Sequence, residues 1–428
     1  MTENDNASDD TAEAPAYPVL AAPADGVPDV IVDERELQRA AEAVAAADGP
    51  VAIDAERAAG YRYGNRAYLV QLRREGAGTF LIDPIALPDL SPMQEAIGDA
   101  EWVLHAATQD LPCLAEVGMR PHALFDTELG SRLAGLPRVG LAAVIEHYLG
   151  ISLAKEHSAV DWSTRPLPEP WLTYAALDVE VLVEVRNRLR DDLEQQDKLD
   201  WALQDFTALT SFTGPPQRGE PWRRTSGMHR IRDKRAIARV RELWLTRDAI
   251  AQERDTAPGR ILPDAMIVEL ANVGPRTTEA LQKIGSSLPG ASRSRTRLAG
   301  RGATRYAARW LDAIARVAAM NDAELPPATV RNDAPPPQRT WSDRNPEAAA
   351  RLSFVRARLA EFAEQRQLPI ENLITPDTLR RVLWTPPKPL DDNGIRTRLS
   401  DLGARPWQID LVTPYILAAP DEPPATGE

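Results

Sequence analysis

The sequence predicts an α/β domain followed by two all-α domains. Three observations lead to this prediction. Strand-like runs are confined to the first part of the 428-residue chain, the remainder has the apolar periodicity of helices, and two proline-rich segments separate the resulting blocks. We expect an acidic tail without fixed structure over residues 1–17, the α/β domain over 18–213, a linker over 214–225, a helical domain over 226–325, a second linker over 326–346, a second helical domain over 347–420 and a tail over 421–428.

Within the α/β domain, the runs VAIDAE, AYLVQLRR and TFLIDP are separated by turns that contain glycine. Such spacing indicates an antiparallel meander. WVLHAA, at residues 102–107, is predicted as a further short strand. The longest helix is expected to begin near Pro170, and its apolar stripe carries Tyr174, Leu177, Val181, Val185 and Leu189.

The two helical blocks resemble each other in sequence. Residues 253–270 and 364–383 each run from a helix end through a proline turn to a Pro-Asp pair. In each block the aspartate can lie near the N-terminus of the next helix. We therefore predict an internal duplication.

Composition excludes several classes of protein. One cysteine, Cys113, excludes a disulfide framework, and five histidines argue against a zinc-ligand cluster. No apolar run approaches the roughly 20 residues that span a bilayer. The acidic N-terminus lacks the basic and apolar segments of a signal peptide, so we expect a cytoplasmic protein without a membrane partner. GRGATR follows no strand and lacks the Lys-Ser/Thr pair of a phosphate-binding loop, so no nucleotide cofactor is expected.

Charge is distributed unevenly along the chain. The net charge is −13, yet the stretch from Arg218 to Arg309 holds twenty Lys and Arg against nine Asp and Glu, about +11. Arg301, Arg305 and Arg309 are expected on one helix face after the run SRSRTR. A solvated helix face would explain them, but a run this free of acids favours contacts with nucleic-acid phosphates.

Four carboxylates are the main candidates for chemistry. Asp54 and Glu56 share one face of a predicted strand, roughly 7 Å apart. Asp110 follows the strand WVLHAA, and Asp178 follows Tyr174 by four residues on the inward face of a helix. Alone, Asp54 could cap a strand end and Asp178 could pair with an arginine. Together, with no basic partner evident nearby in sequence, they would repel one another, and two divalent cations such as Mg²⁺ or Mn²⁺ would relieve that repulsion.

These residues occur in an order that resembles a known superfamily. The motifs of the DEDD exonucleases, in their tyrosine-containing branch, resemble Asp54-x-Glu56, His105-A-A-T-Q-Asp110 and Tyr174-A-A-x-Asp178. The segment DWSTRPLPEPWLTYAALDVEVL and the strand AYLVQL with Gln71 are similar to the ribonuclease D family in particular. LWLTRDAIAQERDTAPGRILPDAMI resembles a helicase-and-RNase-D C-terminal (HRDC) domain, and the second helical block resembles it less closely.

The resemblance implies a ribonuclease-H-like exonuclease domain followed by two HRDC-like domains. It implies that Asp54 bridges two metal ions, that Glu56 and Asp178 help to hold one, and that Asp110 holds the other. Tyr174 would orient or help to deprotonate the attacking water. The implied activity is a metal-dependent 3′–5′ exoribonuclease that trims tRNA precursors or other 3′-extended RNA and releases nucleoside 5′-monophosphates.

The chain departs from the family pattern at two positions. Arg57 stands where many relatives have an aromatic residue that stacks on the terminal base, and Ala106 stands where many have asparagine. An arginine can stack on a base or pair with a phosphate. We expect Arg57, His105 and Gln71 to contact substrate, although His105 could instead be a strand-end residue bonded to the backbone.

Two other functions remain open at this point. The same site could serve an exonuclease of single-stranded DNA, although no polymerase or helicase module is visible in the sequence. A catalytically dead RNA-binding scaffold is the second alternative. The presence of all four carboxylates argues against it.

Overall fold

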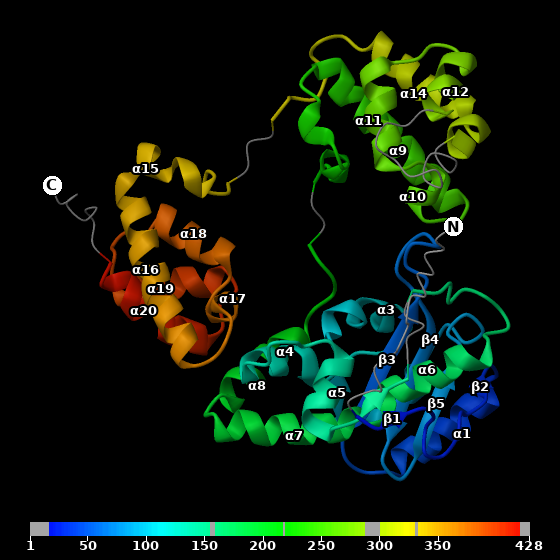
Figure 1. The fold of residues 1–428 in the computed structure, drawn as a ribbon, viewed down its shortest axis with the longest axis vertical. Coiled ribbons are helices and arrows are strands. Elements are labelled where there is room, and N and C mark those ends of the chain that lie inside the picture. Colours follow the sequence, from blue (N-terminus) through cyan, green and yellow to red (C-terminus); the bar gives the residue numbers. More distant parts are fainter. Residues whose placement is uncertain (1–16, 155–158, 217–218, 287–299, 330–332, 420–428) are drawn as a thin grey trace, which may run out of the picture.

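The computed structural model describes residues 17–154, 159–216, 219–286, 300–329 and 333–419. Its first domain is built on a six-stranded mixed sheet in the order β2-β5-β4-β3-β6-β7. Figure 1 labels β2, β3, β4 and β5 of this sheet. The strands are β2 (Val30–Ile31), β3 (Val51–Arg57), β4 (Ala67–Arg74), β5 (Gly78–Ile82), β6 (Glu101–Leu104) and β7 (Ala123–Asp126). A separate parallel pair joins β1 (Val19–Leu20) to β8 (Ser152–Leu153).

The expected antiparallel meander is confirmed in the centre of this sheet. β3 pairs antiparallel with β4, and β4 pairs antiparallel with β5. Parallel pairings extend the sheet on both sides, from β3 through β6 to β7 and from β5 to β2. The helices of this domain are α1 (Glu34–Ala45), α2 (Ser91–Ile97), α3 (Leu111–Glu116), α4 (Thr127–Ala134), α5 (Leu141–Leu149), α6 (Glu169–Glu180), α7 (Leu182–Gln195) and α8 (Leu199–Leu209).

The two faces of β3 pack against different helices. Val51 and Ile53 belong to the core that includes α1 and α2, whereas Ala52 packs with Val179 and Leu182 at the junction of α6 and α7. Because side chains alternate along a strand, Asp54 and Glu56 share the face of Ala52 and point toward α6.

The prediction of one long helix from Pro170 is wrong. α6 ends at Glu180 and α7 begins at Leu182, with Val181 at φ −112° and ψ 7° between them. Tyr174 and Asp178 lie on α6, whose contacts are with β3, β4 and β5. The strand predicted at residues 102–107 also ends early, at Leu104, because Ala106 turns the chain in the left-handed region at φ 59°.

The first helical domain contains α9 (Lys234–Glu253), α10 (Pro258–Ile261), α11 (Asp264–Val273), α12 (Thr278–Ser286) and α14 (Ala307–Ala319). The second contains α15 (Trp341–Arg344), α16 (Pro346–Gln365), α17 (Ile370–Leu373), α18 (Pro376–Trp384), α19 (Asp392–Asp401) and α20 (Pro406–Leu417). In each domain a 20-residue helix leads through a four-residue helix to a helix that carries a Pro-Asp aspartate in its first turn. This parallel supports the predicted duplication.

Residues of both expected linkers contribute to domain cores. Trp222 is buried in the core of the first helical domain, and Trp341 is buried in the core of the second. The second helical domain also packs on the α/β domain, where the rings of Trp201 and Trp407 stack with centroids 4.8 Å apart. Among the described residues, no helix combines the length and apolar character needed to cross a bilayer.

Candidate active site

The five residues predicted to be catalytic line one cleft of about 280 Å³. They come from three separate elements: the end of β3, the turn that follows β6, and the middle of α6. The complete lining consists of Asp54, Ala55, Glu56, Arg57, Ala59, His105, Gln109, Asp110, Leu141, Tyr174, Asp178 and Leu182.

Three of the carboxylates form a group that could hold a metal ion. One oxygen each from Asp54, Glu56 and Asp178 lies within 4.8 Å of the other two. β3 supplies two of them because its alternate residues share a face, and α6 supplies the third because it packs over that face. An all-oxygen set of carboxylates suits hard divalent cations, so these residues fit such an ion.

Asp110 lies outside this group of three but faces the same cleft. It follows the 3₁₀ turn Ala107–Gln109 and directly precedes α3, and it is buried. Its Oδ1 lies 3.4 Å from Nε of Arg57, whose Nη2 also donates to Gln109 Oε1 at 3.1 Å. The acidic set therefore has a basic partner, contrary to the expectation from sequence, and this partner directly follows Glu56.

Burial and mutual repulsion raise the pKa values of these carboxyl groups. Burial raises the pKa of Glu56 well above its usual value, and the charges of Asp54, Asp178 and Asp110 raise it further. The pKa of Asp110 is also well above its usual value, first through burial and then through the charge of Asp54, while Arg57 lowers it. Burial likewise raises the pKa of Asp54. A bound cation would offset these costs of ionisation.

Tyr174 is held in its neutral form. Burial raises the pKa of its hydroxyl well above the usual value, and the nearby charges of Asp178 and Glu56 raise it further. A hydrogen bond to Asp178 acts in the same direction. The ring packs near Trp162, with centroids 6.4 Å apart. Tyr174 can therefore donate a hydrogen bond in this cleft, whereas loss of its proton is strongly disfavoured.

The structure gives Gln71 a different role from the substrate contact predicted for it. Gln71 lies opposite Asp54 in the β3–β4 ladder and is fully buried. Its Nε2 donates to Asp54 Oδ2 at 3.0 Å. Gln71 therefore orients a candidate metal ligand from within the sheet and does not reach the substrate side.

His105 lines the cleft and is neutral at physiological pH. Its Nδ1 lies 2.9 Å from Thr127 Oγ1, and Thr127 in turn donates to the carbonyl of Leu104 at 3.1 Å. Burial lowers the pKa of His105 to about 4. The side chain can form hydrogen bonds with a substrate but adds no positive charge to the site.

Two residues that position the site were missed in the sequence. Asp126, at the end of β7, accepts hydrogen bonds from the backbone of Ala106 at 3.1 Å and Ala107 at 2.9 Å, and so fixes the turn that leads to Asp110. The sequence did contain a signal for Asp126, because the pattern Asp-Thr-Glu is typical of the start of a helix and Asp126 caps α4. Arg165, in the segment before α6, bonds Asp83 through two nitrogens at 2.7 and 2.9 Å and donates to the carbonyl of Tyr68 on β4 at 2.7 Å, so it ties the approach to α6 to the sheet.

The arginines predicted to bind phosphates lie in the first helical domain. The helix that contains Arg301 and Arg305 ends before Tyr306, so the expected single helix face with Arg309 is wrong. Arg309 forms a two-pronged ion pair with Glu253 at 2.6 and 3.0 Å. Arg301 and Arg305 are exposed, and Arg305 lies over the ring of Tyr306. The run SRSRTR lies outside the described residues.

Comparison with known proteins assigns a family to each domain. A model described as 3′-5′ exonuclease matches residues 28–194, and an HRDC model matches residues 236–314. Residues 334–419 match a model described as the 3′ to 5′ exonuclease C-terminal domain. Among solved structures, a protein from Bifidobacterium adolescentis has a TM-score of 0.83 and 39% identity, covering 94% of this chain and 99% of that one. Escherichia coli RNase D shares the fold with a TM-score of 0.63 at 24% identity, covering 83% of this chain and 89% of that one.

The fold and the cleft together define a 3′–5′ exonuclease domain, followed by an HRDC domain and a helical C-terminal domain. Ribonuclease D of Gluconacetobacter diazotrophicus is 31% identical over 293 residues, which are 67% of this chain and 71% of that protein. Ribonuclease D of Sphingobium indicum is also 31% identical, over 55% of this chain and 61% of that protein, so this match spans less than two thirds of the relative's length. The chain belongs to the ribonuclease D family.

Proposed function

We propose that the protein is a divalent-metal-dependent 3′–5′ exoribonuclease that releases nucleoside 5′-monophosphates from RNA 3′ ends. The observation that carries this proposal is the convergence of Asp54, Glu56 and Asp178 within 4.8 Å, in a cleft that also holds Asp110 and Tyr174. A set of buried carboxylates in an open cleft suits cation-assisted phosphodiester hydrolysis. Membership in the ribonuclease D family supports the same activity.

The metal would be Mg²⁺ or Mn²⁺, held at two positions. Asp54, Glu56 and Asp178 would hold one ion, and Asp110 together with Asp54 would hold the other. When bound, such ions neutralise charge on a phosphodiester and favour the ionised form of a bound water. Gln71 keeps Asp54 in place for this role through its 3.0 Å hydrogen bond.

The residues around the metal ligands would bind and orient the reactants. Tyr174 keeps its proton, so its hydroxyl would exchange its hydrogen bond with Asp178 for one to the scissile phosphate or to the attacking water, which it would hold in line. Arg57 would exchange its contact with Asp110 for one with a substrate phosphate, since a guanidinium matches phosphate geometry. His105, neutral and at the cleft wall, would offer a hydrogen bond to the terminal nucleotide.

We infer that the substrates are tRNA precursors or other RNA with a 3′ extension. The stretch from Arg218 to Arg309 carries about +11 in a chain of net charge −13, and this stretch forms most of the HRDC domain. A basic domain joined to an exonuclease domain would hold the body of a long RNA through its phosphates while the 3′ end enters the cleft.

The test is a digestion series with the full chain on RNA and DNA of the same sequence, labelled at the 5′ end. A ladder that shortens from the 3′ end of RNA, requires Mg²⁺ or Mn²⁺ and stops on addition of EDTA is the expected result. The variant Asp54→Asn should give no ladder while binding RNA as the wild type does. Faster digestion of DNA would assign the same site to a DNA exonuclease, and equal activity of Asp54→Asn would refute the assignment of the site.

A further inference from the structure

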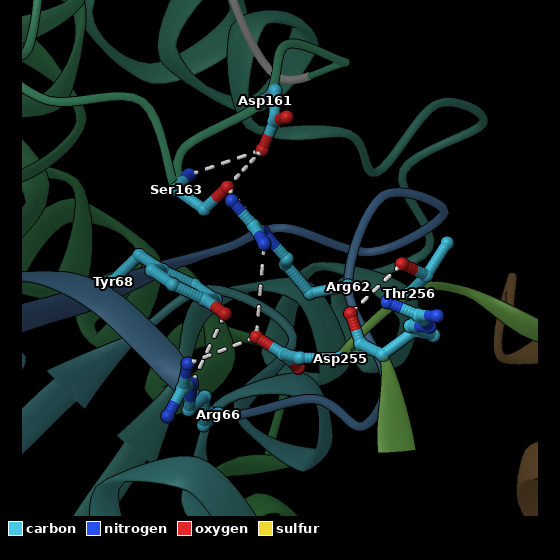
Figure 2. A network of polar contacts seen from close by, with 8 residues as sticks. Arg62, Arg66, Tyr68, Asp161, Ser163, Asp255 and Thr256 are labelled. Carbon is cyan, nitrogen blue, oxygen red and sulfur yellow. Dashed lines mark hydrogen bonds and ion pairs between the residues drawn. The ribbon is translucent and has the colours of Figure 1, made fainter. Parts of the chain in front are cut away.

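The HRDC domain contacts the α/β domain at a polar joint centred on Asp255 (Figure 2). Asp255 lies in the turn between α9 and α10. Its Oδ2 accepts a hydrogen bond from Arg66 Nη2 at 3.2 Å and lies 3.8 Å from Arg62 Nη1. Both arginines belong to the loop of residues 58–66, which joins β3 to β4. One carboxylate of the HRDC domain thus pairs with two cations of the exonuclease domain.

Further contacts hold the same loop against the same turn. The backbone N–H of Ala257 donates to the carbonyl of Tyr61 at 3.0 Å, and Arg260 Nε donates to the carbonyl of Gly60 at 2.6 Å. The guanidinium of Arg260 lies over the ring of Tyr61, 4.2 Å from its centroid. Backbone, ionic and cation–π contacts therefore all join loop 58–66 to residues 255–260.

Tyr63 anchors the loop further along α9. Its hydroxyl donates to Asp248 Oδ2 at 3.2 Å, and its ring packs against the apolar core of the HRDC domain. The loop is thus inserted into the surface of the HRDC domain.

On its other side, the loop is fixed to the segment that leads into α6. Arg62 Nε donates to Ser163 Oγ at 2.7 Å, and Ser163 donates to Asp161 at 2.5 Å, as Figure 2 shows. The hydroxyl of Tyr61 donates to the carbonyl of Ala159 at 3.1 Å. The joint therefore contacts both chain segments that carry the active site, namely the end of β3 and the approach to α6.

The loop also forms part of the cleft itself. It begins directly after Arg57, and both Arg57 and Ala59 line the cleft. The HRDC domain consequently contacts the same loop that supplies Ala59 to the cleft wall. A basic domain in this position is placed to bind the part of an RNA chain that extends beyond the cleft.

We propose that Asp255 is a positioning residue that fastens the HRDC domain to loop 58–66 at the edge of the cleft, and that this fastening sets the preference for long RNA over short oligonucleotides. The proposal rests on the exoribonuclease function proposed above. Without the pair, the HRDC domain would still bind phosphates and keep its other contacts with the loop, but it would be held less firmly in line with the active site. A short oligonucleotide, which the cleft alone can hold, does not need that alignment.

The exposure of the joint makes it responsive to conditions. The side chain of Asp255 is 42% exposed, and those of Arg62 and Arg66 are 39% and 51% exposed. Exposed ion pairs are weak and are screened by salt. The preference for long RNA should therefore fall as ionic strength rises, more steeply than in a variant that has lost the pair.

The experiment compares the wild type with Asp255→Asn, Arg66→Gln and the double variant in the full chain. Asparagine suits position 255, because Asp255 has φ +44° and asparagine tolerates the left-handed region. Activity is measured on a 5-nucleotide RNA and on a 3′-extended tRNA transcript, affinity for the transcript is measured in EDTA, and small-angle X-ray scattering reports the separation of the domains. Asp322→Asn is the matched control, since Asp322 pairs with Arg235 at 3.1 Å within the first helical domain, away from the joint.

Each single variant should raise KM and Kd for the transcript by roughly two- to fivefold, the range expected for an exposed ion pair. The activity of both single variants on the 5-nucleotide RNA should be unchanged, and Asp322→Asn should behave as the wild type in every measurement. The radius of gyration of Asp255→Asn and of Arg66→Gln should increase. The double variant should lose no more than Asp255→Asn alone, because Asp255→Asn already removes the pair with Arg66. Unchanged affinity and scattering in Asp255→Asn would overturn the proposal, as would equal losses in Asp322→Asn. A wild type without ribonuclease activity would refute the proposed function alone, because the affinity and scattering measurements still decide the role of the joint.

Discussion

The guanidinium of Arg57 lies 3.4 Å from the carboxylate of Asp110, although the two residues come from β3 and from the turn after β6. This pair places one positive charge among the four carboxylates of the cleft. It lowers the pKa values of Asp110 and Glu56, which burial and mutual repulsion raise. Arg57 thereby keeps candidate metal ligands closer to their ionised form, although its charge also opposes the approach of a cation.

Replacement of Arg57 by glutamine should therefore change the pH dependence of metal binding in a defined direction. The pKa values of Asp110 and Glu56 should rise further, so Mn²⁺ affinity should begin to fall at a higher pH than in the wild type as the solution is acidified. At high pH, where all ligands are ionised, the variant should bind Mn²⁺ more tightly because a repelling charge is gone. Calorimetric titration with Mn²⁺ between pH 5 and 8 measures both effects.

Arg39→Gln provides the control, because Arg39 is an exposed arginine of α1 whose partner is Glu36. It should leave the Mn²⁺ titration unchanged. If Arg57→Gln and the wild type lost affinity at the same pH, the pair would have no influence on the ligands.

Asp178→Asn should show that the acidic cluster destabilises the metal-free protein and stabilises the protein that has bound metal. The charge of Asp178 raises the pKa of Glu56, so its removal should stabilise the metal-free protein at pH 7. This advantage should shrink as the pH is lowered, because a raised carboxyl pKa costs stability only above the unfolded-state pKa and the full cost is reached above the folded-state pKa. With metal at 100 times its Kd, the wild type should gain about 2.7 kcal/mol and the variant much less.

Thermal unfolding in EDTA and in Mn²⁺ measures both parts of this prediction. The variant should also lose hydrolysis while it keeps RNA affinity. Equal stabilisation of both proteins by Mn²⁺ would remove Asp178 from the ligand set.

The sequence was most informative where chemistry imposes a strict pattern. The spacing of Asp54 and Glu56 predicted a shared strand face, and the apolar stripe around Asp178 predicted its inward direction; the structure places all three together. The positions of Gln71 and Arg57 depend on packing between distant segments. Gln71 meets Asp54 only through the register of β3 and β4, and sequence spacing carries no information about that register.

The apolar periodicity of the sequence also gave no indication of the break between α6 and α7. The apolar stripe continues through Val181 into α7, so a single helix fits the pattern equally well. The structure shows that α6 packs on β3, β4 and β5, whereas α7 packs against α4 and α5. One straight helix could not pack on the sheet and on α4 and α5 at the same time. This constraint arises from tertiary contacts, which the sequence pattern does not contain.

Tyr174→Phe should lower turnover strongly while leaving the fold and the RNA affinity intact. The hydroxyl is protonated because burial raises its pKa well above the usual value, so it acts by donating a hydrogen bond. Loss of such a positioned group lowers kcat by roughly 10²-fold or more. The pH–rate profile should keep its shape, because Tyr174 does not titrate in the working range. A variant profile that lost a rise in rate with increasing pH would show that Tyr174 acts as the base.

Ala106→Asn should stabilise the protein. Ala106 adopts φ 59° at the turn before Asp110, where an alanine costs about 1 kcal/mol and asparagine is favoured. The backbone N–H of Ala106 donates to Asp126, so the turn cannot relax without loss of that bond. Denaturant unfolding should give a gain of roughly 0.5–1 kcal/mol. Ala106→Ser is the control, since serine adds a polar group without a preference for the left-handed region, and an equal gain in both variants would refute the explanation.

Arg301 and Arg305 should contribute to the salt dependence of RNA binding, and Arg309 should not. Arg301 and Arg305 are exposed, whereas Arg309 is neutralised by its two-pronged ion pair with Glu253. Each phosphate contact on a single strand contributes roughly 0.7 to the slope of log affinity against log salt.

The double variant Arg301→Ala/Arg305→Ala should therefore flatten the slope by about 1.4, and Arg309→Ala should leave it unchanged. The loss of affinity should be similar for RNAs of different sequence, because phosphate contacts carry no base information. Fluorescence anisotropy in EDTA at four salt concentrations measures the slopes for all three proteins. A slope that changed with Arg309→Ala would show that RNA displaces Glu253 from Arg309, and an unchanged slope in the double variant would place the RNA-binding surface on other residues of the HRDC domain.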